Sequence, residues 1–105
     1  MAQFTVHENK NARTRGAFPY LLDVQSDLLE ALDTRVVIPL VKAKTRTGKP
    51  ITHLMPLLRI GANDYVLLVP QLAGIARREL GASVAVVAQH RTEIVAALDF
   101  LITGI

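Results

Sequence analysis

The sequence has no cysteine and no tryptophan, and its only aromatic residues are two tyrosines and three phenylalanines. Without cysteine, the chain can form no disulfide and offers no thiol for catalysis or metal binding. Aromatic rings are also what single-stranded nucleic acids stack on, so their scarcity argues against a nucleic-acid groove.

Long apolar runs are also missing. The longest uninterrupted ones, such as residues 65–70, are far too short to span a bilayer. Residues 1–15 carry charge early and lack the apolar core of a secretory signal. We therefore expect a cytoplasmic protein that makes no contact with a membrane.

The composition is that of a globular protein. Half of the 105 residues are hydrophobic and 20% are charged, which predicts one domain over residues 1–105. A short chain this apolar indicates a buried oligomer face. The net charge of +3 favours a solvated basic surface over a DNA groove, and an acidic protein partner is a third interpretation.

Several segments have the apolar alternation or β-branched content of strands. The run over 34–41 is almost continuously apolar, so both of its faces should be covered. Pro56 interrupts one of the other segments, and residues 61–64 should turn the last two into a hairpin. Residues 47–50 should form a turn. The predicted strands are 3–7, 18–24, 34–41, 51–60 and 65–69.

The second half of the chain is less uniform. Residues 70–81 fit a helix capped by Gly81 and fit a strand equally well. A final helix ends at Gly104 and carries one apolar stripe. The stripe consists of Val87, Ile94, Val95, Leu98 and Leu101. These elements predict a mainly β or α+β fold, such as a small β-barrel with a C-terminal helix.

Two short segments look suited to contacts. Ser26 or Asp27 should cap a turn that runs through Leu29 to Leu32. The adjacent Leu28 and Leu29 cannot both face one core from such a turn, so one is exposed or meets a partner. The chain ends in residues 103–105, which either pack into the core or are held out for a partner.

No strong catalytic or ligand-binding constellation is present. The histidines His7, His53 and His90 are not at metal-ligand spacing, so each is interpreted as a surface or hydrogen-bonded residue. Phosphate-loop and nucleophile-elbow patterns are missing, and Asp23 and Asp27 fit local capping. We expect no metal and no cofactor. A ribonuclease that works with one arginine and one histidine or aspartate would not be revealed by spacing.

Four segments, in order, resemble the CcdB family of toxins from toxin–antitoxin modules. They are Gln3-Phe4-Thr5-Val6, the DVQSD segment with its two leucines (residues 23–29), the strand at residues 35–40 and the terminal Gly104-Ile105. The resemblance extends over essentially the whole chain. It implies an SH3-like barrel of antiparallel strands with a small side sheet and a C-terminal helix. It also makes residues 75–80 a strand.

The resemblance also implies a function. Members of the family are homodimers and not enzymes; they bind the A subunit of DNA gyrase and trap its complex with cleaved DNA. A CcdA-like antitoxin neutralises the toxin through a disordered segment, for which a basic surface is suitable. Toxin and antitoxin together repress their own operon, so the toxin would meet DNA only indirectly.

The gyrase-contacting positions implied by the resemblance are Leu28, Leu29, Thr103, Gly104 and Ile105, with Asp99 and Ile102 as weaker transfers. Thr103 departs from the family, because its well-known members have tryptophan there. Losing such an anchor could cost about 2 kcal/mol, or roughly thirtyfold in affinity. Two other functions remain open: a ribonuclease toxin of the related MazF/Kid type, and a non-toxic homologue that only binds antitoxin as a co-repressor.

Overall fold

The computed structural model describes residues 2–45 and 53–104. Its strands are β1 (Thr5–Asn9), β2 (Tyr20–Asp23), β3 (Thr34–Lys42), β4 (Leu57–Ile60), β5 (Asn63–Leu67), β6 (Ala73–Ala76) and β7 (Leu80–Val86). The α-helix α1 is Arg91–Thr103. Short 3-10 helices are η1 (Asp27–Leu29), η2 (Ala43–Thr45), η3 (Val69–Gln71), η4 (Arg77–Glu79) and η5 (Ala88–His90).

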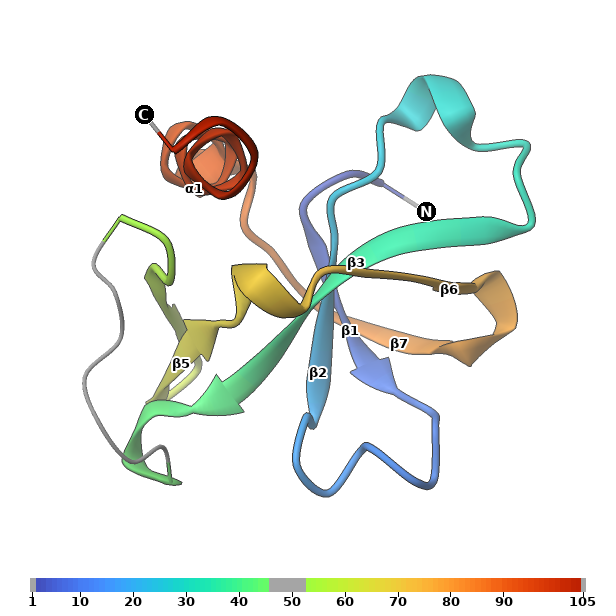
Figure 1. The fold of residues 1–105 in the computed structure, drawn as a ribbon. Coiled ribbons are helices and arrows are strands. Elements are labelled where there is room, and N and C mark those ends of the chain that lie inside the picture. Colours follow the sequence, from blue (N-terminus) through green and yellow to red (C-terminus); the bar gives the residue numbers. More distant parts are fainter. Residues whose placement is uncertain (1, 46–52, 105) are drawn as a thin grey trace.

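Strand β3 organises the sheet, whose strands pair antiparallel in the order β4-β5-β3-β2-β1-β7. The C-terminal half of β3 pairs with β5, and its N-terminal half pairs with β6. Because β3 pairs with both β5 and β6 in addition to β2, the sheet curls into a half-barrel with α1 beside it (Figure 1). The predicted barrel-like antiparallel sheet with a C-terminal helix is confirmed.

The sheet is covered on both faces at β3, as its continuous apolar run predicted. Ile38 and Leu40 point into the main core, which also contains Ile94 of α1. Val37 points the other way, into a smaller cluster with Leu21. Alternating side chains of one strand therefore fill two cores, and α1 is fixed to the sheet through the larger one.

Two predicted strands differ from the observed ones. The strand predicted at 3–7 is shifted to Thr5–Asn9, because Phe4 has a positive φ of 64°, which is incompatible with an extended strand. Strand β4 begins directly after Pro56, which has no N–H for the ladder. The rest of the predicted strand is not formed over 53–56, while its residues 51–52 and the predicted turn at 47–50 lie outside the described residues.

The stretch 70–81 contains two strands rather than a helix. Strand β6 pairs with the N-terminal half of β3, placing Ile75 opposite Arg35, and η4 then turns the chain into β7. The strand implied at 75–80 is therefore misplaced and is interrupted by η4. Gly81 is not a helix cap: it lies in β7, where an added Cβ would come within 3.0 Å of the Glu8 carbonyl oxygen.

Val87 does not belong to the C-terminal helix, contrary to the predicted stripe. It precedes η5 and is buried, while α1 begins at Arg91. Pairing with β1 makes residues 80–86 a strand, so tertiary contacts decide the structure of this segment. Within α1, Ile94 is buried, Val95 and Leu98 pack against the core, and Leu101 is exposed.

Candidate functional site

The end of α1 extends beyond the core. We call residues 99–104 the tail. Ile102 is 76% exposed, and residues 101–104 are all classed as exposed. The alternative that the end of the chain packs into its own core is therefore wrong for residues 101–104. Ile105 lies outside the described residues, so its predicted role stays a prediction.

Backbone geometry defines how the tail ends. Gly104 adopts a left-handed conformation with φ of 72°, and its N–H donates to the Phe100 carbonyl at 2.9 Å. This is the glycine cap predicted from the sequence. The Thr103 hydroxyl donates to the Asp99 carbonyl at 2.7 Å. Both bonds hold the last turn of α1, to which residues 99–103 of the tail belong.

A second exposed apolar surface lies at the turn between β2 and β3. We call residues 27–33 the leucine turn. Leu28 is 95% exposed, while Leu29 and Leu32 are about half exposed. The sequence predicted that Leu28 or Leu29 is exposed or meets a partner. The exposure is confirmed, and it holds for both leucines. A turn that exposes three leucines is typical of a contact surface.

Ser26 starts this turn, as predicted. Its side-chain oxygen accepts from the Leu28 N–H at 3.2 Å. We expect Ser26→Ala to lower the free energy of unfolding by about 0.5–1 kcal/mol, because one N–H of the turn loses its partner. Urea denaturation measures this. Ser83→Ala, on an exposed position of β7, should change stability by less than about 0.5 kcal/mol. Equal losses in the two variants would argue against the cap.

A buried ion pair underlies the leucine turn. Asp23 and Arg35 are both fully buried, with 2.7 Å between the Arg35 Nη2 and Asp23 Oδ2 atoms and 2.9 Å from Nε to the same oxygen. The sequence interpretation of Asp23 as a local cap is only part of its role: its other oxygen accepts from the Gln25 N–H at 3.0 Å. The pairing with Arg35 was not foreseen, because the two residues meet only when β2 pairs with β3.

Gln25 connects this pair to the leucine turn. Its side chain donates to the Leu29 carbonyl at 3.1 Å and accepts from the Val36 N–H at 3.0 Å. The Gln3 N–H donates to Asp27 Oδ1 at 2.8 Å, so the residues that precede β1 hold the start of the turn. Residues of the DVQSD segment therefore position the exposed leucines through hydrogen bonds that the sequence motif alone did not reveal.

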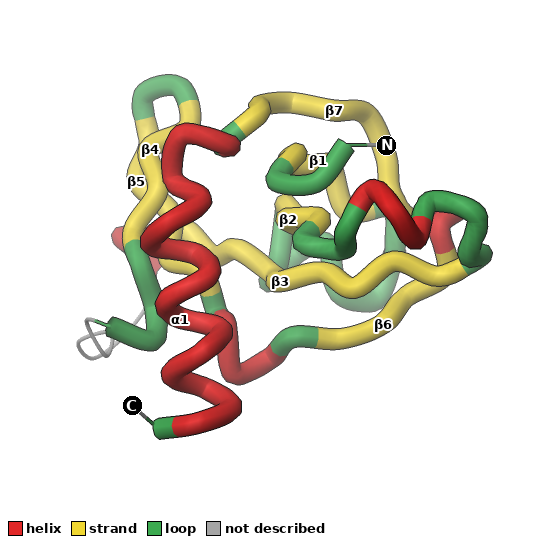
Figure 2. Tube along the Cα trace, turned by 90° about the horizontal axis from the view of Figure 1, so that it is seen from above, coloured by secondary structure: helices red, strands yellow, loops and turns green. Residues whose placement is uncertain are grey.

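The two surfaces do not meet within one chain. The tail and the leucine turn lie on opposite sides of the molecule in both the frontal view and the view from above (Figures 1 and 2). The predicted contact residues thus form two separate surfaces. They are the tail with Asp99, Ile102, Thr103 and Gly104, and the leucine turn with Leu28 and Leu29.

A cavity of about 190 Å³ lies elsewhere, beneath the loop between β1 and β2. Its lining includes Phe18, Val37 and Ile75, and it contains neither the tail nor the leucine turn. Among the described residues Glu79 is the only charged one that lines it, and its carboxylate accepts from the Asn11 side chain at 3.1 Å. The described lining contains no arginine, which a ribonuclease of the kind considered from the sequence would use.

The histidines are separate from one another and have structural or surface surroundings, as predicted. Nδ1 of buried His7 lies 3.0 Å from the Gly81 carbonyl oxygen. Exposed His53 lies beside Phe100, with ring centroids 6.4 Å apart. His90 Nδ1 is 3.4 Å from a Glu93 carboxylate oxygen. Among residues 2–45 and 53–104, no three histidine, cysteine or acidic residues are grouped to hold a metal ion. No helix in the same ranges is long and apolar enough to cross a membrane.

The fold defines the structural class. The chain is similar to a solved structure described as "Endoribonuclease in complex with its cognate antitoxin from Mycobacterial species". The match has a TM-score of 0.73 and 16% sequence identity, and it covers 97% of this chain and 94% of that one. At this identity the likeness establishes a shared fold, a curled antiparallel sheet with a C-terminal helix.

The family is more specific than the fold. A family model described as "CcdB protein" matches residues 3–104, and the chain belongs to the CcdB family. It is a toxin of a toxin–antitoxin system, and its partner in that system is an antitoxin. The resemblance carried by the four sequence segments is thereby confirmed.

Proposed function

We propose that this toxin acts by binding rather than by catalysis. As a homodimer it binds the A subunit of DNA gyrase and traps the gyrase complex with cleaved DNA, and a CcdA-like antitoxin neutralises it. The observation that carries the proposal is the exposed tail: Ile102 and Gly104, to which the resemblance transfers a gyrase contact (more weakly for Ile102), are exposed in a chain of the CcdB family.

The mechanism follows from symmetry and differential affinity. A dimer presents each surface twice, and a partner with twofold symmetry can engage both copies. If the toxin binds the open, DNA-cleaved state more tightly than the closed state, it shifts the population toward the cleaved state. The exposed aliphatic side chains of the tail and the leucine turn supply the apolar contacts, and no chemical step by the toxin is needed.

Purified toxin, gyrase and supercoiled plasmid test the proposal directly. The expected product is linear plasmid that appears after denaturation and protease treatment, with gyrase carrying the cleaved DNA. A host with a toxin-resistant gyrase A subunit should survive induction without antitoxin, while its wild-type parent should die. Death of both hosts, together with intact plasmid in the assay, would contradict gyrase as the target.

The likeness to an endoribonuclease fold makes RNA cleavage the second candidate. The residues for such chemistry would be sought at the start of α1, where His90 and Arg91 stand next to each other and His90 is 3.4 Å from Glu93. Incubation of the toxin with RNA in metal-free buffer tests this. Cleavage that disappears in His90→Ala would support a ribonuclease of the MazF/Kid type.

Normal growth on induction, with antitoxin still bound, would support the remaining alternative, a non-toxic homologue that acts only as a co-repressor.

The leucine turn gives a matched mutational test of gyrase binding. Leu29 is 50% exposed and Leu57, on β4, is 53% exposed, so their truncation removes similar exposed area. We expect Leu29→Ala to weaken binding to the gyrase A subunit about tenfold, within the range of an interface contact. Leu57→Ala should leave the dissociation constant within about twofold. Equal losses, measured by calorimetry, would remove the leucine turn from the interface.

A further inference from the structure

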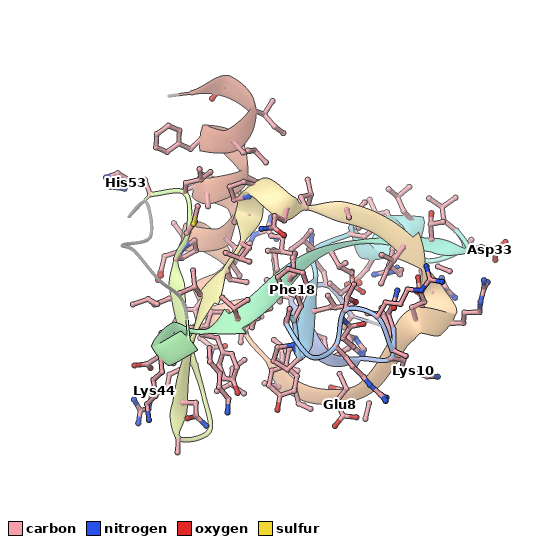
Figure 3. All side chains as sticks on the ribbon, turned by 60° about the horizontal axis from the view of Figure 1, so that its bottom comes forward. Glu8, Lys10, Phe18, Asp33, Lys44 and His53 are labelled. Carbon is pink, nitrogen blue, oxygen red and sulfur yellow. The ribbon has the colours of Figure 1, made fainter. Side chains whose placement is uncertain are left out.

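Acidic residues lie in both the leucine turn and the tail, although the chain as a whole has a net charge of +3. Asp27 and Asp33 stand at the two ends of the leucine turn, and Glu30 lies between them. Figure 3 shows Asp33 at the far end of β3, away from Lys44 and His53. Asp99 lies in the last part of α1, whose last turn contains no basic residue. The helix dipole adds negative potential there.

Four acidic residues elsewhere contact other side chains. Asp23 is paired with Arg35, and Asp64 lies 3.4 Å from Arg59. Glu79 accepts from Asn11, and Glu93 lies beside His90. Within residues 2–45 and 53–104, by contrast, no cationic side chain forms an ion pair with Asp27, Asp33 or Asp99.

The cations nearest to the leucine turn are bound to neutral groups. Arg77 donates from its side chain to the Leu32 carbonyl at 2.9 Å and from its backbone to the Asp33 carbonyl at 2.9 Å. Arg91 lies over the Phe4 ring and donates to the Gln3 side chain at 3.4 Å. Arg77 therefore brings one positive charge to the leucine turn, against the two carboxylates of Asp27 and Asp33.

We propose that these acidic residues determine specificity by fitting a partner surface in which apolar grooves are bordered by arginine or lysine. The inference rests on the proposed function and assigns that surface to the gyrase A subunit. Carboxylates form charge-assisted hydrogen bonds with arginine and lysine, so cations at the border of an apolar groove would match both the leucines and the acidic residues. Charges at the rim of an interface mainly steer association and exclude wrong partners. An acidic antitoxin segment would be repelled from the same surface.

Charge reversal at two sites, with a matched control, tests the inference. Asp33→Lys and Asp99→Lys are each expected to slow association with the gyrase A subunit about five- to tenfold at low salt, and the double variant more. Glu8→Lys makes the same change of charge on an exposed part of β1 and should alter the rate less than about twofold. The differences in association rate should shrink in 0.5 M salt, where the Debye length is roughly 5 Å or less.

The neutral variants Asp33→Asn and Asp99→Asn change the side chains less and so control for misfolding of the lysine variants. Their association rates should lie between those of the wild type and the lysine variants. If the wild type fails to bind the gyrase A subunit, the proposed function and this inference both fail. If the wild type binds but the reversed variants associate like Glu8→Lys, this inference fails and the proposed function stands. Antitoxin binding, measured in parallel, should not weaken in either reversed variant; a matching loss there would also overturn the inference.

Discussion

Deletion of Gly104 and Ile105 is expected to abolish trapping of cleaved DNA by gyrase while the protein stays folded. Residues at the centre of an interface contribute about 2–4 kcal/mol each, which corresponds to roughly thirtyfold to a thousandfold in affinity. The fold should survive because residues 101–104 are exposed and α1 is held by buried Ile94 and Ala97. The plasmid cleavage assay measures the loss, and circular dichroism checks the fold.

A second variant separates side-chain contact from helix capping. The deletion also removes the bond from Gly104 N–H to the Phe100 carbonyl. Gly104→Ala strains the left-handed conformation but meets no atom within 4 Å. It should therefore keep much of the activity that the deletion loses. If the deleted protein traps cleaved DNA as well as the wild type does, the tail is not the gyrase contact.

Arg35→Met is expected to produce the largest loss of stability. It leaves the Asp23 carboxylate buried without its cation, and breaking a buried pair from one side costs about 3–5 kcal/mol. That is a large part of the roughly 5–15 kcal/mol by which most domains are stable. Urea denaturation measures the change, at one fixed protein concentration because the stability of the proposed homodimer depends on concentration.

Two comparisons make the test of the buried pair specific. The double variant Asp23→Leu with Arg35→Met removes both charges and should lose clearly less stability than Arg35→Met alone. Arg59→Ala breaks a pair of exposed side chains at 3.4 Å and should cost less than about 1 kcal/mol. A double variant as unstable as the single one would show that packing, rather than an unpaired charge, accounts for the loss.

The same variants connect stability with function. Arg35 Nη2 also approaches the Gln25 carbonyl at 3.4 Å, and Gln25 holds Leu29. The buried pair therefore positions the leucine turn as well as joining β2 to β3. The DVQSD segment combines the two tasks: its buried residues build the support, and the leucines that follow it form the surface.

Local chemistry determined a large part of this protein from the sequence by itself. The continuous apolar run at 34–41 predicted a strand buried on both faces, because each of its side chains needs a core to enter. The sequence predicted Ser26 or Asp27 as the cap of the turn, and Ser26 takes that position. Gly104 predicted the helix end. Both features depend on a single residue and its nearest backbone. The adjacent leucines predicted exposure for the same local reason.

Only the tertiary structure decided the features that depend on distant partners. Residues 73–76 and 80–86 are strands because β3 and β1 offer them edges, which helix propensity at 70–81 and around Val87 could not reveal. Asp23 and Arg35 meet only after their strands pair. The separation of the tail from the leucine turn likewise follows from the path of the whole chain. Each of these depends on contacts between residues far apart in the sequence, where local preferences carry no information.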